Sequence, residues 1–298
     1  MRKSSNQQYL AIFGLLFGAM CWGIIWYPYR IMSDAGVSGI VSSFYTYCIA
    51  IILGGILFAK HWHGIFSLPK SAIWLSIIAG WTNLSYVLAV IDGEVMRVML
   101  LFYLSPLWTL LLARFWLKES ITKSGLFSIL IAMIGAYIML ANPFDSAANH
   151  LPIPQNNAEW LALSAGIGFS FTNVISRKST HLSLAAKSMV IWVGVAGMSV
   201  LLSPFLKDAF PSPQSFTLSN WLIMALIAIL IMAATLFVQY GVTKMTALRA
   251  SVLFLFELVV AAIAAYYLAN EAMLLNEWIG GVLIIAAGLL AAFNHADD

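Results

Sequence analysis

The sequence predicts an all-α polytopic membrane protein with ten transmembrane helices, arranged as two inverted-topology repeats of five helices. Three observations lead to this prediction: an apolar composition, ten long apolar runs and a likeness between the two halves. Of the 298 residues, 62% are hydrophobic and 9% are charged, and the mean hydropathy is +0.91. A soluble domain usually carries roughly 25% charged residues. The composition therefore excludes a water-soluble enzyme, a nucleic-acid-binding protein and a disordered chain, and requires apolar side chains to face lipid.

The elements follow from the apolar runs, since a spanning helix needs roughly 20 mostly apolar residues. The first run begins behind the basic residues Arg2 and Lys3 and continues without a cleavage site, so we interpret it as a retained helix and not as a signal peptide. Turn and charge signals, such as Asp92-Gly93-Glu94, separate the runs. The ten runs are Leu10–Tyr29, Val37–Ala59, Ser71–Ile91, Val95–Trp116, Ile121–Ala141, Ala158–Ser176, Ala186–Phe205, Leu218–Tyr240, Ala247–Ala269 and Trp278–Phe293.

The distribution of Lys and Arg predicts the orientation in the membrane. With the N-terminus in the cytoplasm and ten alternating helices, 12 of the 15 basic residues fall in cytoplasmic segments. The other three, Arg30, Arg97 and Lys207, fall outside. The longest loop, Asn142–Asn157, has no Lys or Arg, as an external loop should. Both termini are therefore predicted to be cytoplasmic.

The two halves, residues 1–145 and 146–298, resemble each other. Leu104-Ser105-Pro106-Leu107 is followed by Leu117-Lys118-Glu119, and Phe256-Glu257-Leu258-Val259 is followed by Ala269-Asn270-Glu271, with the same 13-residue offset from Pro106 to Glu119 and from Leu258 to Glu271. Because each half has five helices, the second must enter the membrane from the opposite side. Such inverted repeats are typical of secondary transporters, with a solute chamber between the halves near the midplane. Duplicated bundles also occur in channels and membrane enzymes.

These residues carry a specific resemblance. The Gly18…Trp22-Gly23 opening, Ser105-Pro106 with Lys118-Glu119, and Glu257 with Glu271 resemble the drug/metabolite transporter superfamily in its EamA-like branch. By length and by Tyr86 and Tyr103, the chain is most similar to the YddG-type amino acid exporters of Gram-negative inner membranes. The resemblance implies a secondary exporter of amino acids, aromatic and other, or of similar small metabolites, located in the bacterial inner membrane.

Polar side chains at membrane depth are candidates for binding a solute, because burying them is costly. Glu257 is the one ionisable residue near the centre of any run. Its carboxylate could hold a substrate ammonium or take up a proton during the cycle. The alternative is a hydrogen bond between helices, with the acid protonated.

The third and fourth runs offer four further candidates. Thr82 and Tyr86 are four residues apart and share a helix face, and Asn83 lies beside them. Tyr103 precedes Ser105-Pro106, and Pro106 frees a backbone carbonyl one turn earlier because it has no N–H. The kink is a cavity wall or, alternatively, a packing feature without solute contact.

Aromatic and hydroxyl side chains of other runs complete the set. Trp160 and Ser164 are four residues apart in the sixth run, although Trp160 also suits an interfacial belt. Trp22 continues a stripe with Gly14 and Gly18, which could equally be a small-xxx-small packing face. Thr235 and Gln239 are the pseudo-symmetric counterparts of the third-run group.

No cofactor or metal is predicted. Cys21 and Cys48 lie inside apolar runs, and His61-Trp62-His63 lacks further ligands nearby. The absence of a phosphate loop, a nucleophile elbow or an HExxH motif argues against an enzyme or an ATP-driven pump. The predicted partners are a small-molecule substrate, an amino acid, and membrane lipid, without nucleic acid, and a monomer is compatible with these features. Alternatives are export of a cationic drug, a nucleoside or a sugar nucleotide, and, from another class, a membrane enzyme or a channel.

Overall fold

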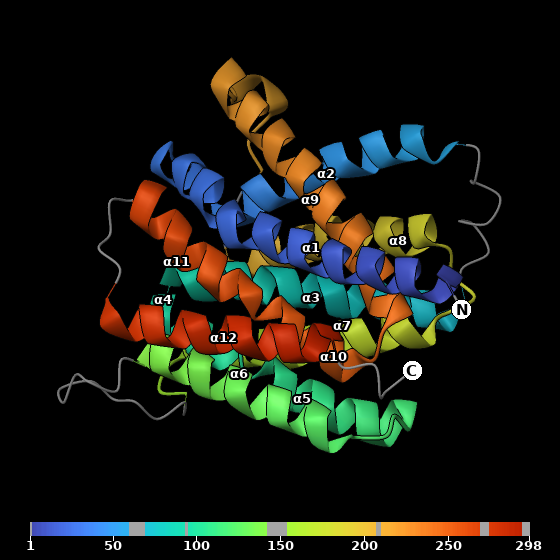
Figure 1. Ribbon diagram of the computed structural model, residues 1–298. Helices are drawn as coiled ribbons and strands as arrows, with labels where there is room; N and C mark the ends of the chain where they lie inside the picture. Colours follow the sequence, from blue (N-terminus) through green and yellow to red (C-terminus); the bar gives the residue numbers. More distant parts are fainter. Residues whose placement is uncertain are drawn as a thin grey trace.

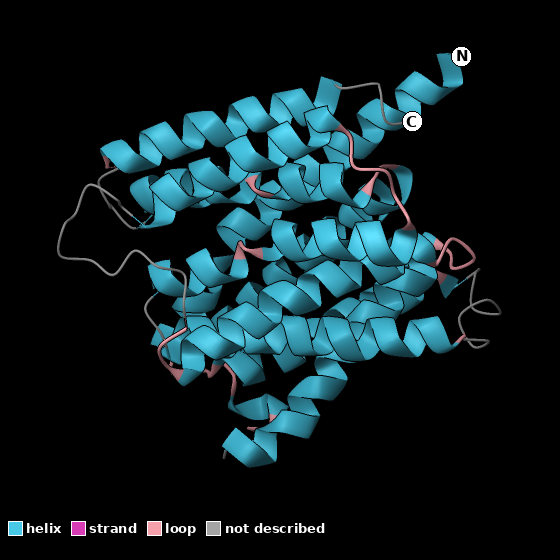
Figure 2. Cartoon of the chain, turned by 90° about the horizontal axis from the view of Figure 1, so that it is seen from below, coloured by secondary structure: helices cyan, strands magenta, loops and turns pink. Residues whose placement is uncertain are grey.

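The computed structural model describes residues 2–59, 69–92, 95–141, 154–206, 210–268 and 274–293, and all regular structure within these ranges is helical (Figure 2). The all-α prediction is thus confirmed for the described residues. The elements are α1 (Arg2–Asp34), α2 (Gly39–Leu57), α3 (Lys70–Asp92), α4 (Val95–Phe102), α5 (Ser105–Leu112), the π-helical turn η2 (Ala113–Leu117), α6 (Lys123–Ala141), α7 (Asn157–Lys178), α8 (Leu184–Leu206), the 3₁₀ turn η3 (Pro213–Ser215), α9 (Leu218–Lys244), α10 (Ala247–Phe254), α11 (Phe256–Leu268) and α12 (Leu275–Phe293).

Seven helical segments in the described ranges are long and apolar enough to cross a membrane. Two shorter apolar helices, Lys123–Ile138 and Trp278–Ala291, lie within α6 and α12, and α7 is 22 residues long but carries more polar side chains. The count of ten spans and their inverted order therefore stay predictions. The seven segments are Asn6–Asp34, Gly39–Leu57, Lys70–Ala89, Val98–Leu117, Leu184–Phe205, Leu218–Lys244 and Ala247–Leu268.

Large apolar side chains cover much of the outside of the bundle. Phe115 is 78% exposed, Phe205 79%, Ile56 72% and Val282 63%. A soluble monomer rarely exposes contiguous apolar surface on this scale. The exposed surface therefore suits contact with lipid, as the composition predicts.

Polar caps set where several helices begin. Free N–H groups at a helix start need an acceptor, which a Ser, Thr or Asn side chain can supply. The Ser38 side chain accepts from the Val41 N–H, and the Thr217 side chain accepts from the Asn220 N–H. At the start of α7, Asn156 accepts from the Glu159 N–H at 2.9 Å, and the Glu159 carboxylate accepts in return from the Asn156 amide at 3.2 Å. Such a reciprocal pair fixes the first turn.

Helices of alternating direction give the bundle two distinct ends (Figure 1). Lys70, Lys118, Lys178 and Lys244 all lie at one end, which we call the basic end. Helix α1 begins and α12 ends there, on the right of Figure 1. Asp34 lies at the opposite end. The first part of α9 tilts away from the other helices at this opposite end (Figure 1).

The packing of the helices follows a matched pattern. Helix α6 packs along α12, and α2 packs against α8. Helix α1 lies along α9 and against α10 and α11, while α7 lies along α3 and against α4 and α5. When α1 to α6 are paired in order with α7 to α12, the contacts of α1 with α9, α10 and α11 correspond to those of α7 with α3, α4 and α5. The contacts of α2 with α8 and of α6 with α12 correspond to themselves.

Candidate functional site

Two helices are interrupted in the middle of the bundle. The first break separates α4 from α5 at Tyr103 and Leu104, where the sequence predicts a kink at Pro106. The second separates α10 from α11 at Leu255, without a proline. Both breaks tighten the backbone into bonds between residues three apart, as in a 3₁₀ turn. The N–H groups of Leu104, Leu107, Leu255 and Leu258 donate to the carbonyls of Leu101, Leu104, Val252 and Leu255, respectively.

A glycine of a neighbouring helix lies directly against each break. A Cβ at Gly166 of α7 would come within 2.5 Å of the Phe102 carbonyl oxygen, and a Cβ at Gly23 of α1 within 2.9 Å of the Glu257 carbonyl oxygen. Only a residue without a side chain allows this approach. The carbonyl of Phe102 is the one that Pro106 deprives of its usual partner. Close helix packing therefore covers irregular backbone at membrane depth, as it must.

Three of the candidate residues meet between the two breaks. The Tyr103 hydroxyl and the Glu257 carboxyl group share a side-chain hydrogen bond. Tyr86 of α3 lies close enough to Glu257 for the two side chains to interact electrostatically. Tyr103 is 4% exposed. We call Tyr86, Tyr103 and Glu257, together with the aromatic rings packed on them, the Glu257 group.

The rings of the Glu257 group come from four elements. Phe102 is the centre, with its ring centroid 4.8 Å from that of Tyr86, 5.2 Å from Tyr103 and 5.6 Å from Phe169 of α7. Phe169 in turn lies 5.2 Å from Phe254 of α10. Sequence reasoning misses these three phenylalanines. The repeat could have pointed to two of them, because Phe102 and Phe254 stand four residues before Pro106 and Leu258, but Phe169 has no such signal.

Asn83 belongs to a second polar contact, about one helical turn before Tyr86 in α3. Its side-chain Nδ2 donates to the Tyr47 hydroxyl of α2 at 3.0 Å. The Asn83 Oδ1 is buried and has no hydrogen-bond partner in the described part of the chain. Tyr47 is 1% exposed and packs in the same apolar cluster as Trp22. Because leaving a buried acceptor unpaired is costly, Oδ1 is suited to meet a donor from a bound solute or water.

Two other candidate residues, Thr82 and Ser164, form hydrogen bonds within their own helix or with a neighbouring helix. Thr82 Oγ1 donates to the Ile78 carbonyl at 2.7 Å and faces Gly168. Ser164 Oγ donates to the Leu161 carbonyl at 2.8 Å and accepts from Trp81 Nε1 at 3.2 Å. Both hydroxyls therefore have partners within the protein, and neither belongs to the Glu257 group.

Trp160 and Trp22 fit the alternatives that the sequence leaves open. Trp160 is 59% exposed in the first turn of α7, a position that suits an interfacial belt. Gly14 and Gly18, in the stripe of Trp22, pack on α9, where a Cβ at Gly18 would meet Val238 at 2.2 Å. The stripe is thus a small-residue packing face, and Trp22 itself is half-buried at its end.

Thr235 and Gln239 are bonded to neighbouring helices. Thr235 Oγ1 accepts from Trp192 Nε1 of α8 at 3.2 Å. Gln239 Oε1 accepts from the Ser176 hydroxyl of α7. The structure does not bring either residue to the Glu257 group. No three His, Cys, Asp or Glu side chains come together in the described ranges, and His61-Trp62-His63 lies outside them, as does Glu271.

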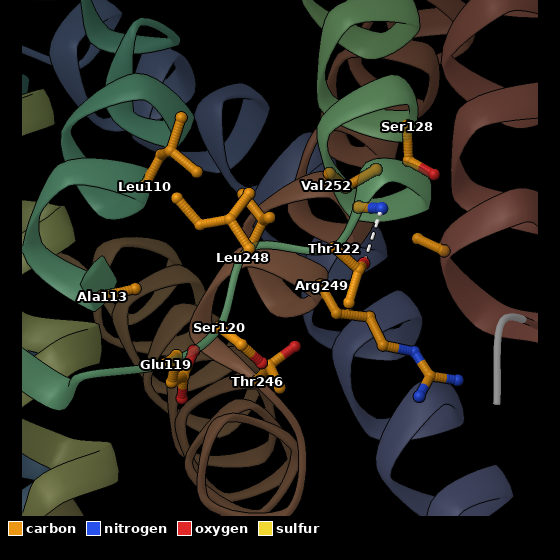
Figure 3. A pocket seen from close by; sticks show the side chains of 13 residues that line it. Leu110, Ala113, Glu119, Ser120, Thr122, Ser128, Thr246, Leu248, Arg249 and Val252 are labelled. Carbon is orange, nitrogen blue, oxygen red and sulfur yellow. Dashed lines mark hydrogen bonds between the residues drawn. The ribbon is translucent and has the colours of Figure 1, made fainter. Parts of the chain in front are cut away.

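Two clefts in the described part of the chain lie at the ends of the bundle. One, at the basic end, is lined by polar side chains, among them Glu119, Thr246 and Arg249, and by apolar ones such as Leu248 and Val252 (Figure 3). The other, at the opposite end, is lined by Gly36, Ser38, Pro211 and Asn220 among others. The Glu257 group lies between these ends. Where the sequence predicts a solute chamber, aromatic rings are packed together in this conformation.

Comparisons with known proteins agree with this arrangement. The chain is 25% identical to a riboflavin transporter of Brucella anthropi over 263 residues, which cover 85% of this chain and 88% of that protein. It is 24% identical to an uncharacterized transporter of Archaeoglobus fulgidus, with 74% and 76% covered. A solved crystal structure matches with a TM-score of 0.76 at 17% identity, over 94% of this chain and 96% of the other, and shows a shared fold.

The sequence profile of the EamA-like transporter family matches residues 9–141 and again residues 156–293. Together these two ranges hold most of the chain. The chain therefore belongs to the EamA-like transporter family of the drug/metabolite transporter superfamily, and it is a transporter.

Proposed function

We propose that the protein is a secondary transporter that exports amino acids, aromatic and other, or similar small metabolites across the bacterial inner membrane by alternating access. One observation carries the proposal. A carboxylate, Glu257, lies at a helix break in the middle of an apolar bundle, bonded to Tyr103 and surrounded by aromatic rings. An ionisable side chain at this depth is costly and is therefore retained for function.

The chemistry of the Glu257 group suits a zwitterion with an apolar side chain. The carboxylate of Glu257 pairs with an ammonium, and the rings of Phe102 and Phe169 contact an apolar or aromatic side chain. Asn83 Oδ1, in the second polar contact, is an unpaired acceptor in the described part of the chain and suits a donor of the solute. The Tyr47 hydroxyl accepts from Asn83 and so keeps its own proton to donate to the substrate carboxylate.

The architecture supports alternating access between two inverted repeats. The family profile matches the chain twice, the helix contacts fall into matched pairs, and both breaks have the same backbone bonding. Two near-equal packings related by such pseudo-symmetry can open to opposite sides. The basic residues gathered at one end support a cytoplasmic location for that end and for both termini.

The test is flux in reconstituted vesicles. Purified protein should accumulate or release labelled phenylalanine and other amino acids faster than empty vesicles do. Glu257→Gln should lower this flux at least tenfold, because the amide cannot pair with an ammonium. Glu159→Gln, which alters a helix-capping carboxylate at the opposite end, is the matched control and should transport normally. Equal flux in protein-containing and empty vesicles for all 20 amino acids would refute the proposal.

A flavin is a second candidate, since a relative that matches over 85% of this chain is named a riboflavin transporter. The flat rings of the Glu257 group can stack on a flat heterocycle. A neutral flavin ring has no ammonium for Glu257, so its transport should depend little on that residue. Riboflavin flux that survives Glu257→Gln, without any amino acid flux in the unaltered protein, would favour this candidate.

A further inference from the structure

Glu119 joins the two halves of the chain at the basic end. Its Oε1 accepts from Arg177 Nε at 2.6 Å, and its Oε2 accepts from the Ala247 backbone N–H at 3.0 Å. Glu119 follows η2 of the first half, whereas Arg177 ends α7 and Ala247 begins α10 of the second. The Glu119 side chain is 15% exposed and that of Arg177 is 25% exposed, so the pair is only partly open to water.

The local backbone directs Glu119 toward these partners. Lys118 adopts the left-handed conformation with φ 57°, the one non-glycine residue with positive φ among those described. The chain turns back there, and the Glu119 N–H donates to the Ala113 carbonyl at 3.1 Å. The left-handed conformation is strained for a residue other than glycine, because the Cβ atom crowds the backbone. The surrounding contacts must offset this strain. The position of Glu119 is therefore fixed by both its backbone and its side-chain hydrogen bonds.

The contacts of Glu119 are part of a group of polar contacts at the basic end. Arg177 also donates to the Thr243 carbonyl of α9 at 3.4 Å. Beside it, Lys187 Nζ of α8, only 1% exposed, donates to the Ser176 carbonyl at 2.6 Å. Glu119 and Thr246 also line the cleft at this end (Figure 3). These bonds connect the segment after η2 with α7, α8, α9 and α10 at the basic end.

We propose that Glu119 is the latch of the basic end: its bonds to Arg177 and to the start of α10 hold the two halves together in this conformation and must break for that end to open. The inference rests on the proposed alternating access, in which one half moves against the other. The bond to the Ala247 N–H also places the carboxylate at the N-terminus of α10, where the helix dipole stabilises a negative charge. Glu119 contacts no part of the Glu257 group, so its role is to set the conformation and not to bind solute.

A distance measurement tests the latch without any substrate. Cys21 and Cys48, the two cysteines of the chain, are replaced by Ser, and nitroxides are attached at Lys118→Cys and Lys244→Cys, two exposed positions in different halves at the basic end. Pulsed electron resonance then gives the distance distribution in vesicles. Glu119→Gln should raise the ratio of long to short distances about tenfold, since a hydrogen bond to a charged group is lost.

Ala247→Pro provides a second variant that leaves Glu119 in place. Ala247 is the first residue of α10 and follows Thr246 in extended conformation, a position where proline is well tolerated. Proline removes the N–H that Glu119 accepts, so the distances should lengthen as in Glu119→Gln. Glu159→Gln is the control and should leave the distribution unchanged.

Coupling between the partners completes the test. Arg177→Gln should lengthen the distances in the same direction, and the double variant should lengthen them no more than Glu119→Gln alone, because both variants remove the bond between Glu119 and Arg177. Unchanged distances in Glu119→Gln and Ala247→Pro, or fully additive effects of Glu119→Gln and Arg177→Gln, would overturn the latch. The distances do not depend on the solute, so a failed amino acid flux with lengthened distances would refute the proposed function and leave the latch standing.

Discussion

The two helix breaks share one backbone and differ in chemistry. In each break, two N–H groups donate to the carbonyl of the residue three positions earlier in the chain. A glycine of a neighbouring helix lies against each break. The first break holds Tyr103, Ser105 and Pro106, whereas the corresponding positions of the second hold Leu255, Glu257 and Leu258. The scaffold is thus duplicated while the charged group is single. The duplicated scaffold allows two related conformations that open to opposite sides. The single carboxyl group provides one defined place to bind a solute.

The largest expected effect comes from filling the space at a break. Gly166→Ala places a Cβ within 2.5 Å of the Phe102 carbonyl oxygen, which cannot move without disturbing the break. We expect a loss of about 3 kcal/mol in stability, the upper end for overpacking. Gly23→Ala, with its nearest atoms at 2.9 Å, should cost less. The measurement is the midpoint of thermal unfolding in detergent.

Gly197 of α8 supplies the control for this comparison. Nothing lies within 4 Å of a Cβ built there, so Gly197→Ala should leave the midpoint unchanged or raise it slightly. If Gly166→Ala unfolds at the same temperature as Gly197→Ala, the close packing of Gly166 against the first break does not contribute to the stability of the protein.

A smaller effect is expected from the hydroxyl that links the two breaks. Tyr103→Phe removes the hydrogen bond to Glu257 and leaves the carboxyl group with one partner fewer, at a cost of about 1–3 kcal/mol. We expect solute affinity in vesicle flux to fall about tenfold. Tyr86→Phe is the matched variant, because Tyr86 acts on Glu257 only through proximity, and its effect should be weaker. Equal losses in the two variants would argue against a special role for the bond between Tyr103 and Glu257.

The comparison also shows what the sequence can and cannot predict. Apolar runs place the helices, and Pro106 marks the first break because a missing N–H has a local consequence. The second break has no proline and could be found only through the repeat. Contacts between residues far apart in the sequence cannot be predicted from the residues next to them. Glu119 and Arg177 are 58 positions apart, and neither their pairing nor their burial follows from the neighbouring sequence. Trp160 shows the converse, since its spacing with Ser164 suggests a shared site that its 59% exposure does not support.

The smallest expected effect concerns the proline itself. The second break forms around Leu255 with the same bonds as the first and without a proline, so Pro106 is not required for the geometry. In Pro106→Ala the new N–H could pair with the Phe102 carbonyl and straighten the helix, but Gly166 packs against that carbonyl and Ser170 donates to the Ser105 carbonyl at 2.8 Å, and both contacts favour the break. We expect a change in stability below about 1 kcal/mol and nearly normal flux. A large loss of flux with unchanged thermal stability would show instead that the two breaks are held by different means, and that the first depends on proline for its movement between conformations.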